Sequence, residues 1–141
     1  MKNRKVYGDS YLEVPVYRVK GENELMEFSN LEPVDTIVIP SELFREGSIV
    51  IINRGDSMEK LIMDGTNVVI DTTKRDIMSG GIYALSIPWE GCIIRECHSE
   101  HQGLLLRPYN KNYPESTVTW GEFEPDMVIG EVYCSVINVF R

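Results

Sequence analysis

Short runs of apolar residues recur along the chain, and their spacing predicts β-strands rather than helices. Residues 11–19 (YLEVPVYRV) alternate apolar and polar positions and are rich in β-branched side chains, as expected for a half-buried strand. Residues 49–52 (IVII) are continuously apolar, which is typical of a strand buried on both faces. Because Pro15 has no N–H to donate, we expect the first of these strands at an edge of the sheet.

Similar runs continue to the end of the chain and are separated by turn signals such as Asp64-Gly65. The main helical signal is short, with Ser41 placed to cap a helix over residues 41–45. The pattern therefore predicts a single mostly-β domain over residues 11–141, with one or two short helices. Its further strands are predicted at 36–40, 67–71, 81–87, 92–97, 103–107 and 128–140.

Two stretches lack these patterns, and the overall charge narrows the range of partners. Residues 1–10 are expected to form a tail or the end of a linker, and residues 21–35 an acidic surface loop. The chain of 141 residues has 14 basic and 22 acidic side chains, a formal net charge of −8. This balance argues against direct binding of a nucleic-acid backbone, because such binding depends on Lys and Arg displacing counterions. No segment predicts a membrane span or a secretion signal, so a cytoplasmic location is expected.

The cysteines and histidines do not predict a metal centre. Cys92, Cys97, His98 and His101 are zinc-ligand types close together in sequence, but their spacing is irregular. In a strand, residues five positions apart point to opposite faces, so Cys92 and Cys97 would diverge. We expect three reduced structural thiols, counting Cys134, with no metal and no cofactor.

The segment RGDSMEKLIMDG (54–65) has two interpretations. In the first, Asp56 caps a short helix, Glu59 completes a capping box, and Ser57 is a passive residue of the first turn. In the second, Ser57 is a nucleophile, which requires a neighbouring base to remove the hydroxyl proton. Local chemistry alone favours the first interpretation.

The order of segments around this motif changes that preference. A buried strand, Gly-Asp-Ser-Met, an apolar turn, Asp-Gly and another β-branched strand resemble the Gly-x-Ser-Met region of LexA-like self-cleaving proteins and of phage CI-type repressor C-terminal domains. The resemblance covers roughly residues 11–140. The residues of the motif that carry it are Gly55, Asp56, Ser57, Met58, Asp64 and Gly65, supported by 14–17, 80–85, 104–106, 109–114 and 129–132.

This resemblance implies a compact, twisted mostly-β fold shared with signal peptidases, and a specific chemistry. In that family, a neutral lysine amine activates the serine, and the protein cleaves its own linker peptide. At the position of the family lysine this chain has Arg95, 38 residues after Ser57. Arginine stays protonated in proteins and cannot act as a general base. We expect Arg95 instead to donate hydrogen bonds to the Ser57 hydroxyl or to a carboxylate such as Asp56 or Glu96.

The bond that would be cleaved also departs from the family pattern. The family is usually cut between a small residue and a glycine upstream of the serine, whereas Gly8 follows Tyr7 and Gly21 follows Lys20. Both departures favour a non-cleaving oligomerisation and regulatory domain of a phage-type transcriptional repressor. The alternative is an active self-cleaving Ser-Lys peptidase, and a β-rich interaction domain with a coincidental motif is a third reading.

The resemblance also implies the partners. We expect a homo-oligomer, a dimer or higher, formed through the apolar last strand. Operator DNA would be bound only through an N-terminal helix-turn-helix module, which these 141 residues do not contain. The acidic stretch 22–35 is a candidate docking surface for an antirepressor protein. The residues expected to mediate oligomerisation are Val132, Tyr133, Val136, Ile137, Val139 and Phe140.

Overall fold

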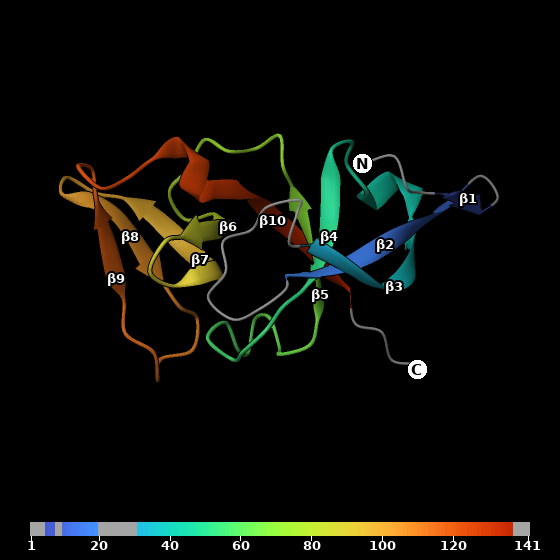
Figure 1. The fold of residues 1–141 in the computed structure, drawn as a ribbon, viewed down its shortest axis with the longest axis horizontal. Coiled ribbons are helices and arrows are strands. Elements are labelled where there is room, and N and C mark those ends of the chain that lie inside the picture. Colours follow the sequence, from blue (N-terminus) through green and yellow to red (C-terminus); the bar gives the residue numbers. More distant parts are fainter. Residues whose placement is uncertain (1–4, 8–9, 20–30, 137–141) are drawn as a thin grey trace.

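A computed structural model describes residues 5–7, 10–19 and 31–136 and shows a mostly-β domain, as predicted (Figure 1). In the described residues, ten strands form one sheet, and the helical elements are two short 3-10 turns, η2 (Ser41–Leu43) and η3 (Pro125–Met127). The strands are β1 (Lys5–Tyr7), β2 (Tyr11–Val19), β3 (Leu31–Pro40), β4 (Ser48–Ile52), β5 (Asn67–Asp71), β6 (Ile82–Ile87), β7 (Gly91–Ser99), β8 (Gly103–Arg107), β9 (Ser116–Thr119) and β10 (Val128–Val136).

The order of the strands across the sheet differs from their order along the chain. Its neighbours run in the order β1-β2-β4-β5-β10-β6-β7-β8-β9, and β3 pairs with β2. Only the β2–β4 pair is parallel; the other described pairs are antiparallel. Figure 1 shows the β8–β9 hairpin at one end of the molecule and β1, β2 and β3 at the other. The segments that carry the motif lie between these ends.

In the described residues, the buried apolar side chains form three clusters rather than one. The cluster that matters for the site joins β4 and β5 to Ala84 of β6 and Ile94 of β7. It also contains Met58 and Ile62, which follow Ser57 in the chain and are 1% and 4% exposed. Their burial anchors the segment after Ser57 to the middle of the sheet.

The expected strands 11–19, 67–71 and 103–107 coincide with β2, β5 and β8. Two expectations for irregular segments are wrong. Residues 5–7 of the expected tail pair with Tyr11–Glu13 as β1, and residues 31–35 of the expected loop belong to β3. In both cases the strand is formed by pairing with β2, a non-local contact that local composition does not report.

The expectations for Pro15 and Ser41 are also wrong. Strand β2 lies inside the sheet, with β3 on one side and β1 and β4 on the other. Pro15 is tolerated because it falls between the β1 pairing, which ends at Glu13, and the β4 pairing, which begins at Val16. Ser41 is the first residue of η2 and makes no cap, since Pro40 occupies the N-cap position and no side chain caps the turn.

The last strand is only partly an edge. Residues 128–131 of β10 pair with β6, and residues 131–136 pair with β5. Beyond Glu131 no described strand pairs with the β6-side edge of β10. The predicted oligomerisation residues Val132, Tyr133 and Val136 lie on this half, while Ile137, Val139 and Phe140 lie outside the described residues.

Candidate functional site

Ser57 lies in a turn that begins where β4 ends and returns to β5. The neck of this turn is closed by backbone bonds from Asn53 N–H to Thr66 O (2.8 Å) and from Gly65 N–H to Asn53 O (2.9 Å). Gly55 and Gly65 have φ angles of 92° and 84°, a region that glycine adopts without steric cost. The Gly55 N–H donates to Asp64 Oδ1 at 2.8 Å. The Gly-Asp-Ser-Met and Asp-Gly segments are thus two sides of one loop.

The segment after Ser57 is a hydrogen-bonded turn and not a capped helix. The Ile62 N–H donates to Met58 O at 2.8 Å, and the Glu59 N–H donates to the backbone oxygen of Asp56 at 3.2 Å. The Asp56 carboxylate accepts a hydrogen bond from the Tyr113 hydroxyl instead of capping the turn. The expected capping box is therefore not formed.

A second turn, residues 109–114, holds the Ser57 turn from outside. The Asn110 N–H donates to the backbone oxygen of Ser57 at 2.9 Å, and Asn110 Nδ2 donates to the backbone oxygen of Asp56 at 3.0 Å. The hydrogen bond to Asp56 raises the pKa of the Tyr113 hydroxyl, so Tyr113 stays a donor. The Asn-x-x-Tyr-Pro turn is thus a positioning element, because it fixes the backbone on both sides of the Ser57 side chain.

Arg95, on β7, faces the Ser57 hydroxyl. Its Nη1 donates to Ser57 Oγ and to the backbone oxygen of Ile94, each at 2.8 Å. The nearest carboxylate in an ion pair is Glu90, with 4.0 Å between Arg95 Nη2 and Glu90 Oε2. The Arg95 side chain is only 12% exposed, and this burial lowers the pKa of its guanidinium, while Glu90 raises it. The expected hydrogen bond to Ser57 is present, but the nearby carboxylate is Glu90 rather than Asp56 or Glu96.

A cavity of about 370 Å³ opens beside these two side chains. Its charged or polar lining includes Ser57, Arg95 and Glu90, and its apolar lining comes from the ends of β2 and β4 and from the first half of β7. Because Ser57 and Arg95 both line this cavity, a molecule bound in it would meet the hydroxyl and the guanidinium together. The apolar residues of the lining are Val19, Ile51, Ile52, Cys92, Ile93 and Ile94.

Among the side chains that the structure describes, no lysine hydrogen-bonds to Ser57. Lys60, Lys74 and Lys111 are all solvent-exposed. In the described part of the chain, the cation bonded to Ser57 is an arginine.

The cysteine and histidine side chains near the site do not converge. Cys92 packs beside the cluster that contains Met58, whereas Cys97 lies in a different buried cluster. Burial raises the pKa of both thiols to about 12, so neither is a reactive thiolate at neutral pH. His98 Nε2 lies 2.6 Å from Glu96 Oε2. Within the described residues, no three His, Cys, Asp or Glu side chains form a group that could hold a metal ion.

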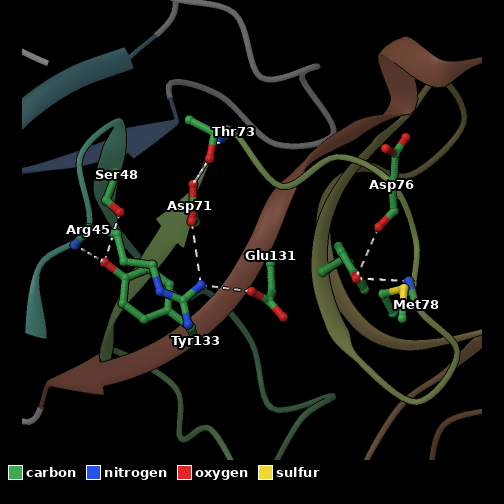
Figure 2. Close-up of polar contacts among 9 residues, drawn as sticks. Arg45, Ser48, Asp71, Thr73, Asp76, Met78, Glu131 and Tyr133 are labelled. Carbon is green, nitrogen blue, oxygen red and sulfur yellow. Dashed lines mark hydrogen bonds and ion pairs between the residues drawn. The ribbon is translucent and has the colours of Figure 1, made fainter.

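A separate polar network joins β10 to β4 and β5 (Figure 2). Arg45 Nη1 donates to Glu131 Oε1 at 2.8 Å and to Asp71 Oδ2 at 3.4 Å. The Arg45 guanidinium carbon lies 4.0 Å from the centre of the Tyr133 ring. The Tyr133 hydroxyl accepts a hydrogen bond from the backbone N–H of Arg45 at 2.9 Å and lies 2.8 Å from Ser48 Oγ. Tyr133, which was predicted to mediate oligomerisation, therefore contacts residues of its own domain.

The comparison with known families agrees with the order of motifs. A family model described as Peptidase S24-like matches residues 13–133. The chain belongs to the Peptidase S24-like family. This is the family that includes LexA and phage repressors, so the resemblance inferred from the motif is confirmed. Within the S24-like domain, the Ser57 turn, the Arg95 strand and the cavity all fall inside the matched residues.

Several contributors to the S24-like site were not singled out as site residues by the sequence. Glu90, Asn110 and Tyr113 reach Ser57, Asp56 or Arg95 through contacts between segments far apart in the chain. The sequence marked two of these residues only as members of the Asn-x-x-Tyr-Pro segment, 109–114, which belongs to the family resemblance but does not indicate which residues it contacts.

In the described part of the chain, no helix is both long and apolar enough to cross a bilayer.

Proposed function

We propose that this domain is a non-cleaving oligomerisation and regulatory domain of a phage-type transcriptional repressor, acting in the cytoplasm. The observation that carries the proposal is the 2.8 Å hydrogen bond from Arg95 Nη1 to Ser57 Oγ. The family chemistry needs a neutral amine at this point, and the chain has a guanidinium.

The direction of this hydrogen bond supports the proposal that the domain does not cleave. Arg95 donates and Ser57 Oγ accepts, so the contact does not remove the proton of the hydroxyl. Burial lowers the pKa of Arg95 but leaves a group that remains charged in proteins. Without a base, the hydroxyl stays a weak nucleophile.

The last strand supports the assembly part of the proposal. The second half of β10 pairs with β5 on one side, and among the described strands it has no partner on the other. An open strand edge presents N–H and C=O groups that a second chain can pair with. Linking two DNA-binding modules through such an assembly raises operator affinity by avidity, without any contact between this acidic domain and DNA.

Incubation under alkaline conditions tests the absence of cleavage. At about pH 10 a large fraction of any available lysine is deprotonated, so a hidden Ser-Lys dyad would become active. We expect the intact mass of the full chain to be unchanged, for the wild type and for Ser57→Ala alike. A fragment that forms in the wild type and not in Ser57→Ala would instead establish the alternative, an active self-cleaving peptidase.

A pair of matched variants tests assembly through β10. Ser135 is exposed on the half-open part of β10, and Thr117 is exposed on β9, the strand at the far end of the sheet. We expect Ser135→Glu to lower the mass measured by sedimentation, because like charges meet across paired strands. We expect Thr117→Glu to leave the mass unchanged. Equal masses for wild type and Ser135→Glu would contradict assembly through β10.

A further inference from the structure

The guanidinium of Arg95 is largely shielded from solvent, with 12% of its side chain exposed, and it has no carboxylate at hydrogen-bond distance among the described residues. Its Nη1 is directed to a neutral hydroxyl and a neutral backbone oxygen, and its nearest ion-pair carboxylate is 4.0 Å away. A buried charge needs a close counter-charge to offset the loss of hydration. Arg95 lines the cavity, and its Nη2 lies 4.0 Å from Glu90 Oε2, which is too long for a hydrogen bond.

Ser57 offers a second donor toward the same space. Its oxygen accepts from Arg95, and a hydroxyl that accepts in this way still has its own proton to donate. Ser57 and Arg95 both line the cavity. A guanidinium and a hydroxyl that converge in this way match the acceptor oxygens of a carboxylate.

The neighbouring backbone indicates what carries the carboxylate. Residues 91–96 of β7 pair with β6, but β8 pairs with β7 only from Glu96 onward. No described strand therefore occupies the other edge of β7 over Gly91–Arg95, and side chains of this segment line the cavity. An extended peptide can add to such an edge through main-chain hydrogen bonds. The apolar lining beside it suits aliphatic side chains next to the carboxylate.

We propose that the cavity beside Ser57 and Arg95 is a receptor for a carboxylate, presented by an extended peptide segment that lies along β7. The proposal rests on the proposed function, since a site that does not cleave can retain what it binds. Arg95 supplies charge and Nη2, and Ser57 supplies its hydroxyl. The arginine that removes catalysis thereby creates a binding specificity, and occupancy of this cavity would be the regulatory input of the domain.

Two carboxylates of the domain lie near this position and differ in their role. Asp56 is held by the Tyr113 hydroxyl and does not pair with Arg95. Glu90 is 35% exposed and competes weakly with the ligand for Nη2. The Glu90 carboxylate has the same charge as the proposed ligand and is partly screened by solvent. Removing its charge should therefore strengthen binding of the carboxylate ligand by about threefold.

Titration calorimetry with matched probes tests the proposal. The probes are the peptide acetyl-Ala-Val-Glu-Val-Ala-amide, the same peptide with Gln in place of Glu, and sodium acetate. We expect the Glu peptide to bind at least about tenfold more tightly than the Gln peptide, the difference made by one charged hydrogen-bonded pair. Arg95→Met should abolish this preference. Arg107→Met, which removes an exposed arginine of β8, should keep it.

Each outcome decides a part of the proposal. Tighter binding of the Glu peptide to Glu90→Gln would support it further. Equal binding of the two peptides, or an unchanged preference in Arg95→Met, would overturn it. Binding of acetate but not of the peptide would support the carboxylate receptor and overturn the peptide source. Cleavage of a probe, detected by mass spectrometry of the same samples, would instead overturn the proposed function. Failure of the binding proposal and failure of the proposed function are therefore distinguishable.

Discussion

Two arginines of this domain sit in polar networks that differ in how completely they are paired. Arg45 has two carboxylates within 3.4 Å and the Tyr133 ring beneath its guanidinium (Figure 2). Arg95 bonds to a hydroxyl and a backbone oxygen, and its carboxylate neighbour lies at 4.0 Å. Yet Arg95 is the more buried of the two, with 12% of its side chain exposed against 46% for Arg45.

The difference indicates two kinds of role. A charge network that is satisfied inside the domain stabilises the fold, as Arg45 does by joining β10 to β5. A buried charge that is only partly satisfied adds little stability, since desolvation offsets the attraction. Arg95 therefore belongs to a site whose missing partner comes from outside. Four predictions test this contrast, starting with the largest effect.

The largest effect is expected for Asp71→Ala. The Asp71 side chain is 3% exposed and accepts from the Thr73 N–H and hydroxyl and from Arg45. Its removal leaves buried donors unpaired and should lower the free energy of unfolding by about 3 kcal/mol. Urea denaturation measures this loss. A change below about 0.5 kcal/mol, the range of ordinary surface substitutions, would remove the structural role given to this network.

The second prediction compares the two arginines directly. Arg45→Met leaves the buried Asp71 without its cation and should lower the free energy of unfolding by about 2 kcal/mol. Arg95→Met keeps the volume of a long side chain and removes a poorly paired buried charge, so its effect should lie within about 1 kcal/mol of zero. Parallel urea denaturation of both variants makes the comparison. Equal losses would mean that the two networks are not different in kind.

The third prediction uses a matched pair of tyrosines. Tyr133→Phe removes the hydroxyl that bonds to the backbone N–H of Arg45 and to Ser48 Oγ. It should lower the free energy of unfolding by about 1 kcal/mol. Tyr113→Phe removes the bond to Asp56 at the exposed rim of the site and should leave the thermal midpoint unchanged. A larger loss for Tyr113→Phe would reverse the assignment of the two regions.

The smallest effect is a dependence on pH. Burial alone would raise the pKa of Asp71, but hydrogen bonds from Thr73 and Arg45 hold it below its ordinary value. The stabilisation is therefore fully present above the unfolded pKa of about 3.9 and is lost as the pH falls through the lower folded value. Urea midpoints of wild type and Asp71→Ala should converge as the pH falls below about 4. Parallel curves at all pH values would contradict this linkage.

The sequence predicted most of the strands because their apolar runs are local and strong, as in 67–71 and 103–107. It missed β1 and β9, which are only three and four residues long and exist by pairing with β2 and β8. It brought Ser57 and Arg95 together through the order of family motifs. It did not identify Glu90 or Tyr113 as site residues, since no local pattern reports which side chains meet across the sheet.

The reactivity of the Ser57 hydroxyl tests the central claim most directly. A serine-directed phosphonylating reagent adds a fixed mass to an activated serine, and mass spectrometry of the intact full chain detects that addition. We expect no addition to the wild type at neutral or alkaline pH, and the same result for Ser57→Ala. Stoichiometric labelling of the wild type that is absent from Ser57→Ala would show that a base activates this hydroxyl, and would contradict the role given to Arg95.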